Sequence, residues 1–269
     1  MKWILGRAGR ATLARFARRR LLVGLDYDGT LAAIVADPAR ATLRTRTRAA
    51  LRRVAARYAC VVISGRSRRD LLPRLGGLGL RQVIGNHGGE PSPQSRQARA
   101  RVRRWRESLA RRLQGLAGVT IEDKGLSLAV HYRRAKDPAR ALDRIAEAAS
   151  RLADARRVGG KCVLNLVPRG APHKGTALEA ERLRLGCDAA LYVGDDETDE
   201  DVFAHPAREQ LGVRVGRGAG SRARYYLRDQ AQVDDLLESL VRLREAKAPA
   251  GRSAPRQVAR ALVARGRVK

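Results

Sequence analysis

The sequence Leu25-Asp26-Tyr27-Asp28-Gly29-Thr30-Leu31 directly follows a short apolar run that begins at Leu21. Such a run, ended by turn residues, is typical of a buried and parallel β-strand. Open α/β sheets bind their ligands at the carboxyl ends of the strands, so Asp26 and Asp28 are candidate functional carboxylates. An Asp-x-Asp-Gly turn can also simply cap a strand, and this stretch alone leaves both interpretations open.

A second acidic cluster favours the functional interpretation. The residues Gly194-Asp195-Asp196-Glu197-Thr198-Asp199-Glu200-Asp201 again follow an apolar run, Ala189 to Val193. Carboxylates gathered this densely require a counter-ion, and two such clusters at strand ends indicate one shared divalent cation.

The composition restricts the class of partner. The chain has 269 residues and a formal net charge of +29, with basic segments at both ends. Arginine dominance beside abundant alanine, leucine and glycine also arises from GC-rich coding, and a basic body attracts small anions as readily as nucleic acid. Aromatic residues make up only 4% of the chain, which argues against base-stacking platforms. We therefore expect a small anionic substrate rather than a nucleic-acid partner.

Strand and helix patterns alternate in the first part of the chain. This βαβαβ order predicts a mainly parallel sheet with helices on its faces. The rhythm then changes to a long arginine-rich helix, a hairpin, a second helix and a second hairpin, after which alternation resumes. The expected strands are 21–25, 59–63, 82–84, 119–123, 126–132, 157–160, 161–167, 191–193 and 213–215, and the expected helices are 45–57, 67–75, 95–114, 138–153, 174–184 and 233–244.

These patterns predict an α/β fold with a Rossmann-like parallel-sheet core into which an αββαββ cap domain is inserted. We expect the core at residues 21–90 and 171–245 and the cap at 91–170. Residues 1–20 are expected to form a basic, frayed N-terminal extension, and 246–269 a basic tail. The chain shows no secretory signal and no run of eighteen apolar residues, so we expect a soluble, cytoplasmic protein without a membrane segment, and a monomer.

Four motifs in order resemble those of haloacid-dehalogenase-superfamily phosphatases. They are Asp26-Tyr27-Asp28-Gly29-Thr30-Leu31, Ser64-Gly65-Arg66-Ser67, a lysine before a helix (Lys174), and the segment that begins at Gly194. Within the sugar-phosphatase branch, the chain resembles trehalose-6-phosphate phosphatases. That resemblance is carried by Asn86-His87-Gly88, Glu122-x-Lys124, His131-Tyr132-Arg133 and Gly194 to Phe203.

The resemblance implies roles for the core residues. Asp26 is the expected nucleophile that forms an aspartyl-phosphate, and Asp28 the expected general acid and base. Mg²⁺ is expected to be held by Asp26, the backbone carbonyl of Asp28 and Asp195, whereas Asp196 either binds the ion or supports it. The remaining catalytic assignments are Ser64 as a phosphoryl hydrogen-bond donor, Lys174 as a fixed positive charge, and Asp199 as the residue that orients Lys174 or a metal-bound water. Lys174 has an alternative as an ordinary surface lysine, and Asp199 as a helix N-terminal acid.

Substrate recognition is assigned to the cap and to the junction between the two units. A disaccharide presents many hydroxyl groups, which paired carboxylates and cations can bind. The resemblance implies sugar contacts by Glu122, Lys124 and Arg133, although Glu122 and Lys124 could equally form a surface ion pair. The other predicted substrate-binding residues are Gly65, Arg66, Asn86, His87 and Asn165; Arg66 is expected to steer the phosphate or to pair with an acid.

One residue departs from the pattern of these phosphatases. Asn165 occupies the place of their usual glutamate in the last cap strand, and an amide lacks the strength of charge-assisted hydrogen bonds. The expected function is Mg²⁺-dependent hydrolysis of trehalose 6-phosphate. The alternatives are a phosphatase for another glycosyl phosphate, such as sucrose 6-phosphate or mannosyl-3-phosphoglycerate, and a basic nucleic-acid-binding protein on the same fold.

Overall fold

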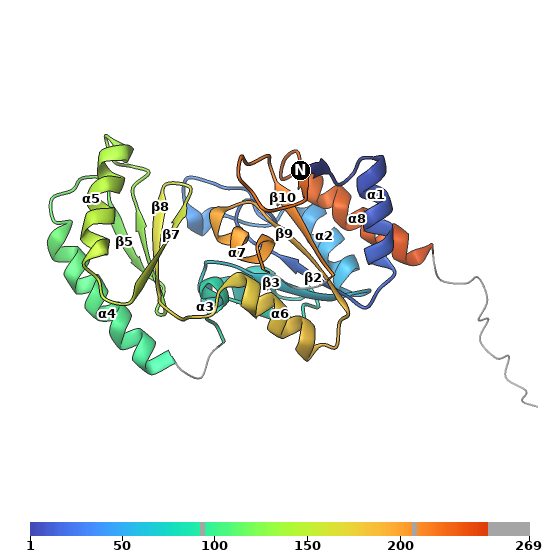
Figure 1. Ribbon diagram of the computed structural model, residues 1–269, viewed down its shortest axis with the longest axis horizontal. Helices are drawn as coiled ribbons and strands as arrows, with labels where there is room; N and C mark the ends of the chain where they lie inside the picture. The colour runs from blue at the N-terminus through green and yellow to red at the C-terminus, as the bar shows by residue number, and fades with distance from the viewer. Residues whose placement is uncertain (92–94, 206–208, 247–269) are drawn as a thin grey trace, which may run out of the picture.

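Two separate β-sheets organise the protein, which we describe from a computed structural model over residues 1–91, 95–205 and 209–246 (Figure 1). The larger sheet has seven strands, and all of its neighbouring strands pair in parallel. In spatial order these strands are β1 (Lys2–Trp3), β11 (Tyr225–Leu227), β10 (Gln210–Val215), β9 (Ala189–Gly194), β2 (Leu21–Leu25), β3 (Ala59–Ile63) and β4 (Gln82–Ile84).

Strand β2 lies between β9 and β3 in the interior of this sheet, and every one of its residues is buried. Leu21, Val23 and Leu25 pack into the core on one face, whereas Leu22 packs into the core on the opposite face. Continuous apolar strands of this kind are expected where helices cover both faces of a parallel sheet. The first face is covered by α1 (Arg7–Ala17), α2 (Thr45–Ala55), α3 (Arg68–Leu75) and α8 (Gln232–Glu245), and the second by α6 (Lys174–Arg184) and α7 (Glu200–Phe203).

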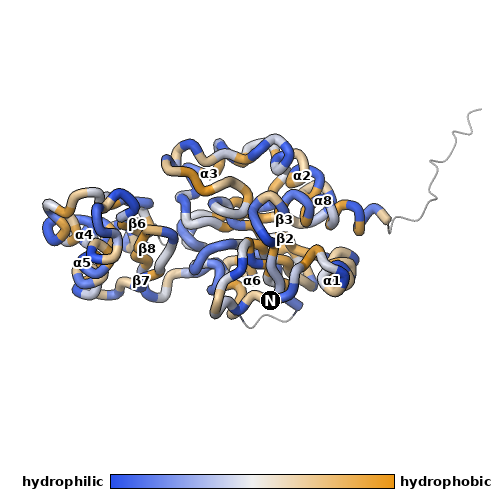
Figure 2. The backbone as a smooth tube through the Cα atoms, turned by 90° about the horizontal axis from the view of Figure 1, so that it is seen from above, coloured by the Kyte–Doolittle hydropathy of each residue, from blue (hydrophilic) through white to orange (hydrophobic). Residues whose placement is uncertain are grey.

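The smaller sheet has its own hydrophobic core and lies beside the carboxyl ends of the central strands. Its four antiparallel strands are, in spatial order, β5 (Thr120–Asp123), β6 (Leu128–His131), β8 (Val163–Pro168) and β7 (Ala155–Gly160). Helices α4 (Ser95–Arg112) and α5 (Pro138–Ser150) pack on one face through Trp105, Leu109 and Ile145. Figure 2 shows these two lobes, with apolar chain concentrated inside each.

The predicted fold class is confirmed: a parallel α/β sheet is combined with an inserted antiparallel sheet. The expectation of a frayed N-terminal extension is wrong. Strand β1 extends the large sheet by pairing with β11, and α1 buries Leu13 and Phe16 against the core. Strand β11 was also missed, and most of the predicted C-terminal tail lies outside the described residues.

The described residues also form three short 3₁₀ turns: η1 (Pro38–Arg40), η2 (Asn86–Gly88) and η3 (Glu197–Asp199). Among residues 1–91, 95–205 and 209–246, no helix combines the length and the apolar character needed to cross a bilayer.

Candidate active site

Asp26 continues the ladder of the large sheet beyond the end of β2. Its backbone N–H donates to the carbonyl of Val193 at 2.9 Å, and its residue is only 4% exposed. Gly29 then adopts a φ of 80°, and a Cβ atom there would lie 2.2 Å from a carboxylate oxygen of Asp195. Glycine is therefore required at this turn both for its backbone conformation and for the close approach of the second acidic segment.

Asp199 stabilises the conformation of the second acidic segment. Its Oδ2 accepts hydrogen bonds from the backbone N–H groups of Asp195 and Asp196 at 2.8 and 2.9 Å. Its Oδ1 accepts from the Tyr192 hydroxyl at 2.7 Å, and the residue is fully buried. The side chain thus fixes the loop that follows β9, and it does not line the open pocket.

Lys174 supplies a buried positive charge from the first residue of α6. Its Nζ lies 3.1 Å from Asp26 Oδ1 and 2.8 Å from Asp199 Oδ1, and the residue is 1% exposed. These carboxylates outweigh desolvation and raise the pKa of Lys174, which keeps the ammonium charged. Burial raises the pKa of Asp26 well above its usual value although Lys174 opposes the shift. The alternative of a surface lysine is therefore excluded.

Three carboxylates form the cluster best suited to a metal ion within the described part of the chain. Oxygens of Asp26, Asp195 and Asp199 lie within 4.8 Å of one another, and all three residues are buried. Burial raises the pKa of Asp195 to about 6, so a cation beside it would offset a substantial desolvation cost. An all-oxygen, anionic donor set fits a hard divalent cation.

The predicted metal ligands Asp28 and Asp196 lie outside this cluster of three carboxylates. The carboxylate of Asp28 faces Arg66, while Asp196 Oδ1 accepts from the backbone N–H of Glu197 at 2.8 Å and caps η3. Both residues line the pocket, but neither belongs to the cluster of three. The role of the Asp28 carbonyl stays a prediction.

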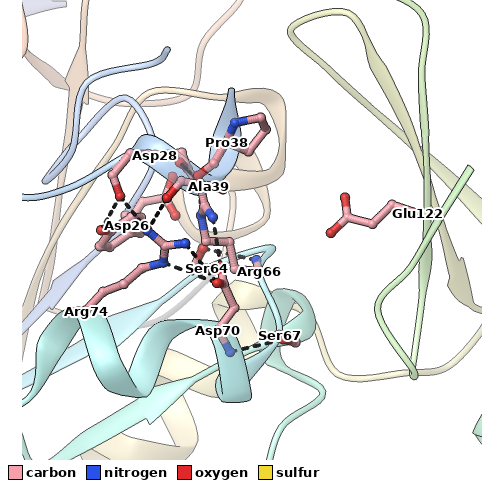
Figure 3. A network of polar contacts seen from close by, with 12 residues as sticks. Asp26, Asp28, Pro38, Ala39, Ser64, Arg66, Ser67, Asp70, Arg74 and Glu122 are labelled. Atoms are coloured by element: carbon pink, nitrogen blue, oxygen red, sulfur yellow. Dashed lines mark hydrogen bonds and ion pairs between the residues drawn. The ribbon is translucent and has the colours of Figure 1, made fainter. Parts of the chain in front are cut away.

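The end of β3 brings Ser64, Gly65 and Arg66 to the same edge of the sheet. Ser64 is buried, and its Oγ accepts the backbone N–H of Arg66 at 3.2 Å. The guanidinium of Arg66 forms two hydrogen bonds of 2.7 Å to the Asp28 carboxylate (Figure 3). Of the two predicted roles for Arg66, steering the phosphate or pairing with an acid, the structure therefore contains the second.

A cavity of about 400 Å³ separates these core residues from the small sheet. Figure 3 shows Glu122 pointing from its cap strand toward the core. Glu122 Oε2 lies 2.8 Å from His131 Nε2, and this hydrogen bond lowers the pKa of Glu122. Burial lowers the pKa of Lys124. The predicted substrate-binding residues that line the cavity are Gly65, Arg66, His87, Glu122, Lys124, Arg133 and Asn165.

Asn86 and His87 have different surroundings. Asn86 donates to the carbonyl of Lys124 at 3.0 Å and accepts from the hydroxyl of Ser127 at 2.7 Å, so it joins the core to the cap and does not line the cavity. His87 does line it, and within the described chain neither nitrogen of its buried ring has a hydrogen-bond partner. Desolvation keeps the pKa of His87 well below its usual value.

Sequence reasoning missed Lys161, which lies between strands β7 and β8 at the tip of their hairpin. Its Nζ is 2.6 Å from Asp195 Oδ2, so the cap places a cation directly on a core carboxylate. Its backbone carbonyl accepts from Arg133 Nη2 at 3.1 Å. The only local signal is a lysine after Gly159-Gly160, which marks a hairpin tip but not its partner.

Comparisons with known proteins agree with this arrangement. A relative from Mycobacterium tuberculosis, described as an uncharacterized glycosyl hydrolase, is 39% identical over 216 residues, which cover 73% of this chain and 16% of that protein. A probable trehalose-phosphate phosphatase from Oryza sativa is 31% identical over 262 residues, covering 83% of this chain and 70% of that protein. The present chain thus spans only a small part of the mycobacterial relative.

The structural and family comparisons extend over most of the chain. The C-terminal domain of trehalose-6-phosphate phosphatase from Candida albicans superposes with a TM-score of 0.73 at 24% identity, covering 87% of this chain and 97% of that chain, which shows the same fold. The family model for trehalose-phosphatase matches residues 24–230. The chain therefore belongs to the trehalose-phosphatase family.

Proposed function

We propose that this protein hydrolyses trehalose 6-phosphate to trehalose and phosphate through a covalent phosphate on Asp26. The observation that carries the proposal is the meeting of Asp26, Asp195 and Asp199 with the buried ammonium of Lys174, beside a cavity that Asp26, Asp195 and Lys174 line. Phosphate monoesters hydrolyse very slowly without a catalyst, and a covalent intermediate divides the reaction into two easier steps.

In the first step an oxygen of Asp26 attacks phosphorus, and the bond from phosphorus to the sugar oxygen breaks. Asp28 donates a proton to the departing sugar oxygen. Lys174 and the hydroxyl of Ser64 stabilise the charge on the transferred group, and Asp199 keeps Lys174 directed at it through their 2.8 Å contact.

In the second step Asp28 accepts a proton from water as the water oxygen bonds to phosphorus. The bond between phosphorus and Asp26 then breaks, which regenerates the Asp26 carboxylate and the protonated Asp28 carboxyl group and releases phosphate. The same side chain thus serves as acid and then as base, so the cycle consumes one water and needs no other reactant.

We propose Mg²⁺ as the cation of this site, held by Asp26 and Asp195, because carboxylate oxygens are ligands that this hard cation prefers. When bound, a divalent cation neutralises the carboxylate and the phosphate oxygens so that they can approach.

The cap, residues 91–170, is proposed to select the sugar above a core built from 21–90 and 171–245. Glu122, Lys124 and Arg133 provide both acceptors and donors around the cavity. Asn165 supports a second candidate, a phosphatase for a different glycosyl phosphate, because this buried amide lines the cavity where the related phosphatases usually have a glutamate. A cytoplasmic location and a monomeric state remain predictions from the sequence.

The test measures phosphate release from trehalose 6-phosphate, sucrose 6-phosphate and mannosyl-3-phosphoglycerate, with Mg²⁺ and after chelation. We expect the highest kcat/KM for trehalose 6-phosphate, no turnover after chelation, and none with Asp26→Asn. A higher kcat/KM for another sugar phosphate favours the second candidate. Inertness toward all of them rejects the function.

The covalent step has its own readout. Protein quenched in acid during turnover of ³²P-labelled substrate is expected to carry label that hydroxylamine removes, as for an acyl phosphate. Label that persists in Asp26→Asn would place the phosphate on another residue.

A further inference from the structure

Arg66 lies between two carboxylates that come from different segments of the core (Figure 3). Its Nε and Nη2 donate to the two carboxylate oxygens of Asp28, both at 2.7 Å. Its Nη1 donates to Asp70 Oδ2, also at 2.7 Å. The planar fork of arginine matches a carboxylate in two places at once, so the bridge fixes the orientation of Asp28 as well as its distance.

The guanidinium is the fixed partner in this bridge. Asp70 lies in the first turn of α3, where its backbone N–H donates to Ser67 Oγ at 3.3 Å, and Arg74 donates to its Oδ1 at 3.0 and 3.2 Å. The side chain of Arg66 is 11% exposed, whereas that of Asp28 is 38% exposed. The more exposed carboxylate of Asp28 therefore depends on the guanidinium of Arg66 for its position.

Few donors of Arg66 remain for a ligand. A guanidinium has five N–H donors. Two of them are taken by Asp28 and one by Asp70, and Nη2 also donates to the carbonyl of Pro38 at 2.8 Å. Lys174 and Ser64 already provide a cation and a hydroxyl on the phosphate side of the cavity. These contacts make Arg66 better suited to act on Asp28 than on the substrate.

We propose that Arg66 is the positioning residue for the carboxylate of Asp28, and that Asp70 in turn holds Arg66. The inference rests on the proposed function, in which Asp28 transfers the proton in both steps. Proton transfer requires the carboxylate within hydrogen-bond reach of the sugar oxygen and of the water. Loss of the bridge therefore lowers kcat, whereas substrate affinity depends on other residues.

A double-mutant cycle separates this role from direct phosphate binding. Arg66→Gln is expected to lower kcat for the sugar phosphate by about 10- to 100-fold with less than about a threefold change in KM, and Asp28→Asn by about 10²- to 10⁴-fold. In the Asp28→Asn background, Arg66→Gln is expected to cause no further loss. Interacting residues are non-additive in this way, whereas an arginine that binds phosphate directly would multiply the two losses.

Two further variants test the geometry. Arg66→Lys keeps the charge but loses the fork, so we expect it to recover less than half of the lost kcat. Asp70→Asn leaves the guanidinium intact and is expected to lower kcat about 3- to 10-fold, again only when Asp28 is present. Arg69→Gln, at an exposed position of the same helix, is the matched control and is expected to retain wild-type kcat.

The folded state of each variant is checked by thermal unfolding. Asp28 and Asp70 are both more than one third exposed, so loss of an ion pair with them costs little stability. The inference would be overturned if the two substitutions lowered kcat multiplicatively, or if Arg66→Gln changed only KM. The proposed function would still stand in that case, because the wild-type protein would turn over its substrate. If the wild-type protein is inert toward every sugar phosphate, the proposed function itself is rejected.

Discussion

Lys174 of the core and Lys161 of the cap lie in opposite environments. Lys174 in the core is 1% exposed and contacts two buried carboxylates, whereas the side chain of Lys161 in the cap is 53% exposed and contacts one. Glu122, on the cap face of the cavity, is likewise half exposed. Buried charges hold a fixed geometry because each must keep its partners, while exposed charges can rearrange in water. The proposed chemistry thus depends on a buried charge, and the proposed selection of the sugar on more exposed ones.

The most direct test of the proposed assignment of the chemistry to the core is to remove the nucleophile. Asp26→Asn is expected to lower kcat by about 10⁴-fold or more for every phosphate ester, because no later step of the proposed reaction can proceed without the covalent phosphate. Phosphate release under saturating substrate measures the effect. Residual activity above about 1% would mean that the core cluster does not carry the chemistry.

The two lysines provide the largest expected difference in stability. Lys174→Met leaves Asp26 and Asp199 buried without their cation and is expected to lower the free energy of unfolding by about 3–5 kcal/mol. Lys161→Met removes a half-exposed ion pair and is expected to cost less than about 1 kcal/mol. Urea denaturation of both variants measures the difference, and equal losses would contradict the contrast between core and cap.

A cap substitution sharpens the assignment of sugar selection. Glu122→Ala is expected to lower kcat/KM for trehalose 6-phosphate by about 10- to 100-fold through KM, the equivalent of about 1.4–2.7 kcal/mol. The loss for p-nitrophenyl phosphate, which has no sugar to bind, is expected to stay within about threefold. The ratio of the two losses is the measurement, and a ratio near one would remove Glu122 from the sugar site.

The smallest expected effect concerns the junction between the two regions. His87 is buried and neutral, and its pKa lies well below the ordinary value of 6.5 because of desolvation and the nearby charges of Lys124, Lys174 and Arg156. As the pH falls below about 6.5 the unfolded chain binds a proton that the folded protein excludes, so stability is lost, at most about 1.4 kcal/mol per pH unit from this group.

Urea denaturation at pH 7.5 and 5.5 tests this linkage. The difference in unfolding free energy between the two pH values is expected to be smaller in His87→Asn, because asparagine does not titrate and tolerates the left-handed backbone at φ 57°. An identical pH dependence in wild type and variant would show that other groups control acid stability.

Local sequence patterns determined the architecture of the protein. Apolar runs that end in turn residues specify the central strands, and parallel strands bring their carboxyl ends to one edge, so Asp26, Ser64 and Asp195 could be assigned to a single site from their positions in the chain. The change to a helix, a hairpin, a second helix and a second hairpin likewise indicated a separate antiparallel sheet.

Only the tertiary structure decided which neighbouring side chains meet. Within one acidic segment, the turn after β9 directs Asp199 into the cluster and leaves Asp196 to cap η3, a difference of backbone dihedral angles that residue types do not encode. Lys161 reaches Asp195 across 34 residues of sequence, and Arg66 reaches Asp28 across 38. The N-terminal strand was missed for the same reason: two residues show no periodicity, and their pairing depends on a partner more than two hundred positions away.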